Sequence, residues 1–142
     1  MKRERFTVKI SVYAYLYKDG NLLFARRINT GWGDGKYGMI AGHLEEKEIL
    51  TECIIREAKE EAGITIQQKD LQIIHIMQRL DCPDYLDIFF LAKKWQGEPH
   101  ITEPDKCDDM EWFDENNLPD NLLPYLKQAW SNYKKNIYFA TF

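Results

Sequence analysis

The 142-residue chain contains only three cysteines and three histidines. Cys53, Cys82 and Cys107 are widely spaced and form no C-x-x-C pair. An odd number of cysteines without metal-binding spacing argues against a disulfide framework and is typical of a reduced, cytoplasmic protein. The histidines share no metal-ligand spacing either, and the sequence gives them no role beyond a position for His43 near a binding cleft.

Long apolar runs and an excess of basic charge are also missing. No segment approaches the roughly 20 apolar residues that span a bilayer, and the N-terminal residues lack the pattern of a secretory signal. The net charge of −4 argues against a protein held to nucleic acid by bulk electrostatics. We therefore expect a cytoplasmic protein that binds neither a membrane nor a nucleic acid polymer.

Apolar and aromatic residues, in contrast, are plentiful, at 44% and 13% of the chain. A chain of this length buries enough surface to fold without a disulfide or metal staple. No internal repeat, linker or low-complexity tract interrupts it, so we predict one domain over residues 1–142.

Strands and helices alternate along the chain. Asp19-Gly20-Asn21 is a strong hairpin signal, and the four glycines of residues 29–38 predict a loop. Residues 81–84 indicate another turn. Strand-like runs cover residues 6–17, 22–27, 37–41, 71–80, 85–95 and 110–113. Helical spacing covers residues 48–62, with Gly63 placed to end the helix, and residues 119–135. This order predicts an α/β sandwich around a mixed sheet.

Three carboxylates meet on the first predicted helix. Glu57, Glu60 and Glu61 stand at positions i, i+3 and i+4, which share one helix face. Crowded carboxylates repel, and hard divalent cations take oxygen ligands of this kind. Arg56 offsets the charge only in part, because its side chain starts about 100° round the helix from Glu57. Taken alone, the triplet also fits a solvated acidic helix face.

The triplet belongs to a longer pattern, G-x5-E-x7-R-E-x2-E-E-x-G. Its fixed positions are Gly42, Glu48, Arg56, Glu57, Glu60, Glu61 and Gly63. Seven fixed positions coincide by chance about once in 10⁸ windows. With this pattern and with the flanking strands, nearly the whole chain resembles the Nudix hydrolases (MutT-like). One departure is His43-Leu44, where many members carry a second glycine.

The resemblance implies a Nudix-type α/β/α sandwich, in which a mixed sheet lies between a catalytic helix and a C-terminal helix. It implies Mg²⁺- or Mn²⁺-dependent cleavage of a nucleoside diphosphate linked to another group. Carried over by position, Glu57, Glu60, Glu61 and the Gly42 carbonyl are metal ligands. Arg56 is the orienting arginine, and Glu48 and Gly63 are structural.

A glutamate outside the pattern often completes the site in this family. Glu103 lies at about the family's spacing, in a predicted loop, and we expect it to act as the general base or as a further ligand. An ordinary exposed acid is the alternative, and Glu98 and Asp105 are weaker substitutes.

Four residues are candidates for substrate binding. Arg26 and Arg27 end a predicted strand where they can reach phosphates, although charged residues at a strand end are more often simply solvated. Trp32 and Tyr37 flank the glycine-rich loop and can stack on a base, although aromatic residues are more often core.

The resemblance leaves the substrate open. Our first hypothesis is hydrolysis of a (deoxy)nucleoside triphosphate, including an oxidised one, to a monophosphate and pyrophosphate. The alternatives are a hydrolase of ADP-ribose, a nucleotide sugar or a dinucleotide, and a Nudix module that binds a nucleotide without cleaving it. The sequence is compatible with a monomer or a homodimer.

Overall fold

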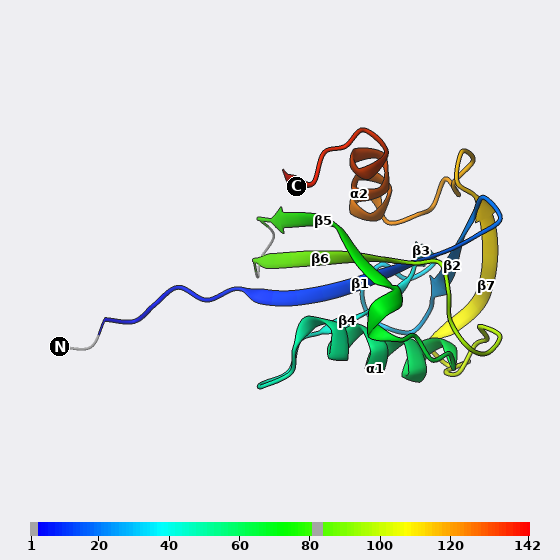
Figure 1. Cartoon of the computed structure of the whole chain (residues 1–142), viewed down its shortest axis with the longest axis horizontal. Helices are drawn as coiled ribbons and strands as arrows, with labels where there is room; N and C mark the ends of the chain where they lie inside the picture. The colour runs from blue at the N-terminus through cyan, green and yellow to red at the C-terminus, as the bar shows by residue number, and fades with distance from the viewer. Residues whose placement is uncertain (1–2, 81–83) are drawn as a thin grey trace.

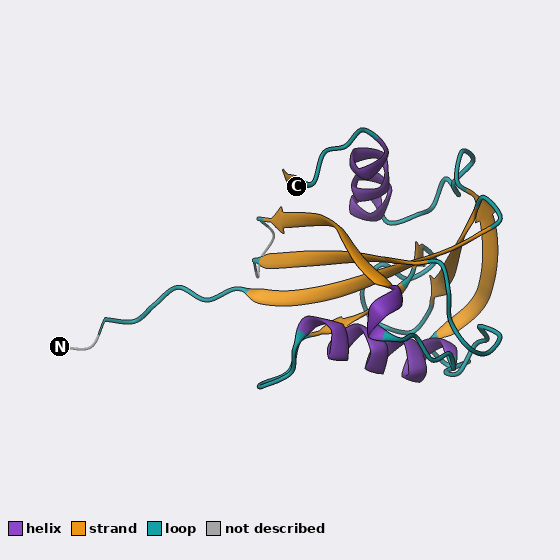
Figure 2. Cartoon of the chain, viewed as in Figure 1, coloured by secondary structure: helices purple, strands orange, loops and turns teal. Residues whose placement is uncertain are grey.

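The computed structural model describes residues 3–80 and 84–142. It contains eight strands, two α-helices and a short 3₁₀ helix (Figures 1 and 2). The strands are β1 (Lys9–Lys18), β2 (Asn21–Arg27), β3 (Tyr37–Gly38), β4 (Ile40–His43), β5 (Leu71–Arg79), β6 (Tyr85–Ala92), β7 (Cys107–Asp114) and β8 (Phe139–Thr141). The helices are α1 (Leu50–Ala62), α2 (Pro124–Lys134) and the 3₁₀ helix η1 (Gln68–Asp70).

The strands form one mixed sheet with the order β3-β2-β1-β6-β5-β8, while β4 pairs with β1 and β7 pairs with β2. Strand β1 runs parallel to β6 and antiparallel to β4 and β2. The predicted mixed sheet is therefore confirmed, and β1 lies at its centre.

The two helices cover opposite faces of the sheet, as Figure 2 shows. Along β1, Val12 and Ala14 belong to the core that packs under α1. Tyr13 and Tyr15, which alternate with them, belong to the core that packs under α2. Because successive side chains of a strand point to opposite faces, a central strand that is covered on both sides carries apolar or aromatic residues on both faces, as residues 12–16 do.

The hairpin between β1 and β2 follows its sequence signal closely. Asp19 and Gly20 have φ angles of 51° and 81°. Two successive residues with positive φ are what a two-residue type I′ turn needs, and Asp-Gly tolerates them well.

Several predicted boundaries were wrong. The run 37–41 is two short strands rather than one, because β3 pairs with β2 whereas β4 crosses to pair with β1. Strand β7 is longer than residues 110–113, since its full length pairs with β2. The second helix begins at Pro124 and not at residue 119, because the backbone of Asn121 and Leu123 is hydrogen-bonded to Tyr37 instead. Strand β8 was missed, and its three residues are partly or fully exposed.

The predicted turn at residues 81–84 and Cys82 lie outside the described residues, except for Asp84. None of the helices in the described residues is long and apolar enough to cross a membrane.

Candidate functional site

Helix α1 presents the three glutamates of the pattern to one cavity. Glu57, Glu60 and Glu61 line a cavity of about 490 Å³, together with residues from the end of β2 and from the segment before β7. We call it the carboxylate cavity. Glu103, on that segment, is also among its lining residues. The structure therefore brings together the three helix carboxylates and the fourth acid expected from the sequence.

The C-terminal end of α1 is fixed by Gly63. Its φ angle is 68°, and its N–H donates to the carbonyl oxygen of Lys59. A side chain at this position would also overlap the ring of His100. Both observations favour glycine, because it alone adopts a left-handed conformation without steric cost and leaves room for the ring.

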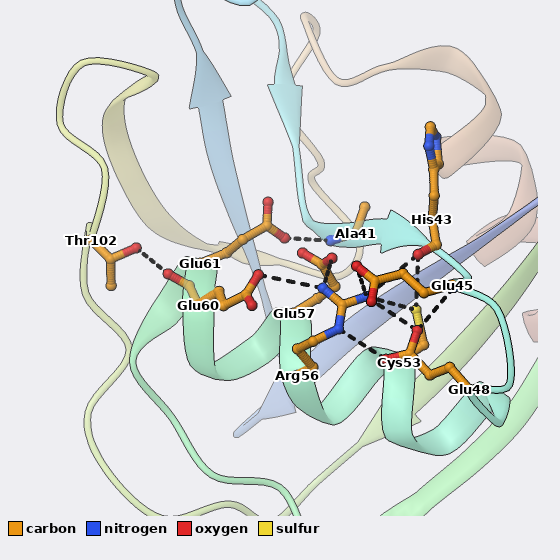
Figure 3. A network of polar contacts seen from close by, with 10 residues as sticks. All are labelled: Ala41, His43, Glu45, Glu48, Cys53, Arg56, Glu57, Glu60, Glu61 and Thr102. Carbon is orange, nitrogen blue, oxygen red and sulfur yellow. Dashed lines mark hydrogen bonds and ion pairs between the residues drawn. The ribbon is translucent and has the colours of Figure 1, made fainter.

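Arg56 lies at the centre of the polar network in Figure 3. Its Nε donates to Glu48 Oε2 at 2.9 Å, and its Nη1 donates to Glu57 Oε1 at 2.7 Å. A longer contact of 3.5 Å joins Nη1 to Glu60 Oε2. The long side chain therefore reaches Glu57 in spite of the angle between their starting points on the helix. The guanidinium also lowers the pKa of the Glu48 carboxyl to about 2.

Glu61 is the most deeply placed of the three carboxylates. It accepts a hydrogen bond of 2.8 Å from the backbone N–H of Ala41 in β4 (Figure 3). Burial raises the pKa of its carboxyl to about 8, and the negative charges of Glu57 and Glu103 act in the same direction. The Glu57 pKa is also raised, chiefly by burial. Burial and mutual repulsion thus both disfavour the charged forms of these carboxylates.

The donor set fits a hard divalent cation. Carboxylate and carbonyl oxygens from α1 and β4 are the ligands that Mg²⁺ and Mn²⁺ prefer. Within residues 3–80 and 84–142, no three acidic, histidine or cysteine side chains already converge as a metal cluster. Arg56 holds Glu57 and Glu60, and the Ala41 N–H holds Glu61, so these side chains must shift to share one ion.

Gly42 allows α1 to approach β4. A side chain on Gly42 would overlap the carboxyl group of Glu57. The next residue, His43, accepts hydrogen bonds at its carbonyl oxygen from Arg56 and from the Cys53 thiol. The backbone of β4 is thus tied to α1 at several points.

The segment before β7 is tied to the same helix. Thr102 donates through its hydroxyl to the carbonyl oxygen of Glu60 at 2.6 Å (Figure 3), and Glu103 follows directly. Lys106 lies 3.9 Å from a carboxylate oxygen of Glu103. Glu98 and Asp105 are not among the described residues that line the carboxylate cavity.

A second, larger cavity adjoins the first. It measures about 760 Å³, and five aromatic side chains line it, so we call it the aromatic cavity. They are Tyr13, Trp32, His43, Tyr85 and Tyr125. Arg27, Gly38 and Met39 line both cavities. A single elongated ligand can therefore extend from one cavity into the other.

Arg27 and Trp32 lie side by side in the wall of the aromatic cavity. Arg27 donates to the carbonyl oxygen of Trp32 at 3.0 Å, and its guanidinium lies 5.3 Å from the centre of the Trp32 ring. Asp34 accepts hydrogen bonds from the backbone N–H groups of Thr30 and Gly31, which fixes the loop. Trp32 is 52% exposed, so its ring is available to a ligand.

Tyr37 does not fit the predicted stacking role. Its side chain is buried and packs edge-on against Phe113, and its hydroxyl lies within hydrogen-bond distance of carboxylate oxygens of Asp109 and Glu111. It is a core residue, as the alternative interpretation held. Arg26 lines the carboxylate cavity but is engaged by both carboxylate oxygens of Asp108.

Sequence reasoning missed Arg79, Tyr85 and Tyr125, which line the aromatic cavity. One signal was available: Arg79 and Asp87 interrupt two apolar strand-like runs, and such charges are usually paired when they are buried. They form an ion pair with side-chain exposures of 6% and 0%.

Comparisons with known proteins agree with this geometry. Residues 7–135 match the family described as NUDIX domain. The chain is 31% identical over 130 residues to the NAD-capped RNA hydrolase NudC of Stutzerimonas stutzeri, which covers 92% of this chain but only 44% of that protein. It is 29% identical over 111 residues to the ADP-ribose pyrophosphatase of Methanocaldococcus jannaschii, covering 78% of this chain and 64% of that one.

The chain thus spans less than two thirds of the length of these curated relatives. Among solved structures, a MutT NUDIX hydrolase from Burkholderia pseudomallei superposes with a TM-score of 0.81 over 89% of this chain and 98% of its own. A MutT protein from Methanosarcina mazei superposes with a TM-score of 0.78 over 90% of this chain and 94% of its own. At 23% and 22% identity, these two likenesses show the fold alone.

Proposed function

This chain belongs to the Nudix hydrolase family, and on that premise we propose that it hydrolyses a diphosphate linkage within a nucleotide. The observation that carries the proposal is the pair of adjoining cavities, one lined by carboxylates and the other by aromatic rings, with Arg27 between them. Such an arrangement suits a ligand with a planar base at one end and metal-bound phosphates at the other.

The carboxylate cavity is our proposed metal site. Glu57, Glu60, Glu61 and the carbonyl oxygen of Gly42 would hold Mg²⁺ or Mn²⁺, which Nudix hydrolases generally use. A bound divalent ion neutralises phosphate oxygens and lowers the pKa of a coordinated water. Arg56 keeps Glu57 and Glu60 oriented through its contacts with both.

Glu103 is our proposed general base or further ligand. It lines the carboxylate cavity together with the glutamates of α1, and Thr102 ties its segment to the helix. As a base it would accept a proton from water while the water oxygen attacks phosphorus and the bridging P–O bond breaks. Arg27 lines both cavities and would bind the phosphate nearest the nucleobase.

A (deoxy)nucleoside triphosphate, including an oxidised one, is our leading substrate class. The base and sugar would occupy the aromatic cavity, and the triphosphate would extend past Arg27 to the glutamates. Hydrolysis would release a nucleoside monophosphate and pyrophosphate.

ADP-ribose, a nucleotide sugar or a dinucleotide is the second candidate class. The names of the two curated relatives favour it, since one acts on NAD-capped RNA and the other on ADP-ribose. The NudC relative is named for an RNA substrate, whereas the net charge of this chain led us to expect no binding to a nucleic acid polymer.

A hydrolysis screen tests the proposal. The panel holds common and oxidised nucleoside triphosphates, ADP-ribose, nucleotide sugars, dinucleotides and an NAD-capped RNA, each with Mg²⁺ or Mn²⁺, and products are identified by mass. Monophosphate plus pyrophosphate supports the leading class, and cleavage confined to a dinucleotide or sugar-linked substrate replaces it. Absence of turnover across the panel supports a binding module instead.

Glu60→Gln is the matched variant for this screen. It keeps the size of the side chain but removes a charge that we assign to metal binding, so we expect the rate to fall at least about a hundredfold, or about 2.7 kcal/mol of barrier. Glu52→Gln is the control, because Glu52 is exposed on the first turn of the same helix. Turnover near wild type in Glu60→Gln would refute the metal assignment.

A further inference from the structure

Arg79 lies between two pairs of aromatic rings in the wall of the aromatic cavity. On one side, the rings of Trp32 and Tyr125 lie 6.2 Å apart between centroids. On the other side, the rings of His43 and Tyr85 lie 5.8 Å apart. The guanidinium of Arg79 lies 4.2 Å from the centre of the Tyr125 ring and 4.6 Å from that of Tyr85. All five side chains line the cavity.

Arg79 is held in place by buried polar groups. Its guanidinium donates to both carboxylate oxygens of Asp87 and to the hydroxyl of Tyr13. The side chains of Arg79 and Asp87 are 6% and 0% exposed. A buried ion pair adds little stability over apolar side chains of the same volume, because desolvation offsets the attraction. This pair does supply a planar cation at a fixed place beside two aromatic rings.

The two rings come from elements that share no strand ladder. Tyr85 begins β6 in the sheet, whereas Tyr125 lies in the first turn of α2, which covers one face of that sheet (Figure 1). No backbone hydrogen-bond ladder therefore fixes the distance between these rings. Arg79, at the end of β5, contacts both of them.

Resting on the proposed function, we infer that Arg79 is a positioning residue that determines recognition of the nucleobase. It holds Tyr85 and Tyr125 in place as walls of the base-binding part of the aromatic cavity. Arg79 is not among the described residues that line the carboxylate cavity. Substitution of Arg79 should therefore weaken binding of the nucleobase and leave binding of the phosphates at the metal site unchanged.

Calorimetric titration of the full chain with two probes tests this separation. The first probe is a set of nucleoside monophosphates (AMP, GMP, CMP and UMP), and the second is inorganic pyrophosphate with Mg²⁺. In Arg79→Met we expect the tightest-binding monophosphate to lose affinity about tenfold, equivalent to about 1.4 kcal/mol. Pyrophosphate affinity should stay within about twofold of wild type. In turnover assays, KM should rise while kcat changes little.

Three further variants separate positioning from folding. Arg79→Lys keeps a cation opposite Asp87 but loses the planar guanidinium, so it should fold normally and still bind the monophosphate more weakly than wild type. The double variant Arg79→Met/Asp87→Leu removes both buried charges and is used if the single variant is unstable. Lys134→Met is the matched control: Lys134 also pairs with a carboxylate (Glu115) and lies against an aromatic ring, but it does not line the aromatic cavity.

Any of three outcomes overturns the inference. Monophosphate and pyrophosphate affinities that fall together, or full rescue by Arg79→Lys, would assign Arg79 a purely structural role. Failure of the wild-type chain to bind any monophosphate would remove the base-binding site itself. The proposed function fails separately: Arg79-dependent binding of monophosphates without hydrolysis of any nucleotide would refute it and leave this inference standing.

Discussion

At the scale of single residues, the carboxylate cavity gathers four acidic side chains whose negative charges repel one another. Arg56 is shared among Glu48, Glu57 and Glu60, whereas Glu61 accepts a hydrogen bond from a backbone N–H. Carboxylates gathered in this way raise one another's pKa and favour a cation. Each acid can therefore be tested by removing its charge while keeping its shape.

Glu103→Gln tests the proposed role of Glu103 as general base or further metal ligand. We expect a loss of at least about tenfold in kcat, or about 1.4 kcal/mol of barrier, because either proposed role needs the negative charge. The assay is steady-state hydrolysis of the best substrate from the screen. Glu98→Gln is the control, since Glu98 is not among the described residues that line the cavity. A loss equal to that of the control would make Glu103 an ordinary exposed acid.

Gly42→Ala tests the close approach of β4 and α1. The added methyl group would overlap the Glu57 carboxyl group, so Glu57 must leave its present position. We expect hydrolysis to slow by about tenfold or more, with a smaller effect on the free energy of unfolding, because the end of a glutamate side chain can move. Hydrolysis at the wild-type rate in Gly42→Ala would contradict this account.

At the scale of elements, the C-terminal end of α1 carries a second steric requirement. Gly63→Ala places a side chain both at a φ of 68° and against the His100 ring. We expect a loss of about 1–2 kcal/mol in the free energy of unfolding, measured in urea, from the left-handed conformation alone. Adding His100→Ala removes the overlap, so the double variant reports the backbone cost by itself. A double variant as stable as His100→Ala would show that the backbone conformation costs nothing.

The elements that the sequence predicts well are those whose own residues determine them. The Asp19-Gly20 hairpin and the end of α1 at Gly63 depend on local conformational preferences, and both were predicted correctly. The split between β3 and β4 and the edge strand β8 depend on which strand lies alongside. Pairing of this kind joins residues far apart in the sequence, so it cannot be predicted from a local pattern.

The same distinction holds for the candidate site. The glutamates of α1 share one helix, so their spacing alone placed them on one face. The sequence left Tyr37 open between a stacking role and the core, because its burial depends on Asp109, Glu111 and Phe113 from β7. Arg79 and Tyr125 were missed because they come together only through the packing of α2 on the sheet.

At the scale of the whole molecule, the carboxylate cavity draws its lining from segments that span most of the fold. Strand β2, the segment around β4, helix α1 and the segment before β7 all contribute residues. A cation held there would bind the folded chain and have no comparable site in the unfolded one. Metal binding should therefore stabilise the entire fold rather than one helix.

Thermal unfolding with and without metal measures this coupling. At a metal concentration about 100 times Kd, binding adds about 2.7 kcal/mol to the free energy of unfolding. For a chain of this size, we expect Tm to rise by about 5–10 °C relative to a sample in chelator. Glu60→Gln should lose most of this shift, because one of the proposed ligands is gone, whereas Glu52→Gln should keep it. Since the comparison needs no substrate, it tests the metal site independently of catalysis. An equal shift in both variants would mean that the cation stabilises the protein from somewhere else, and the glutamates of α1 would then need another explanation.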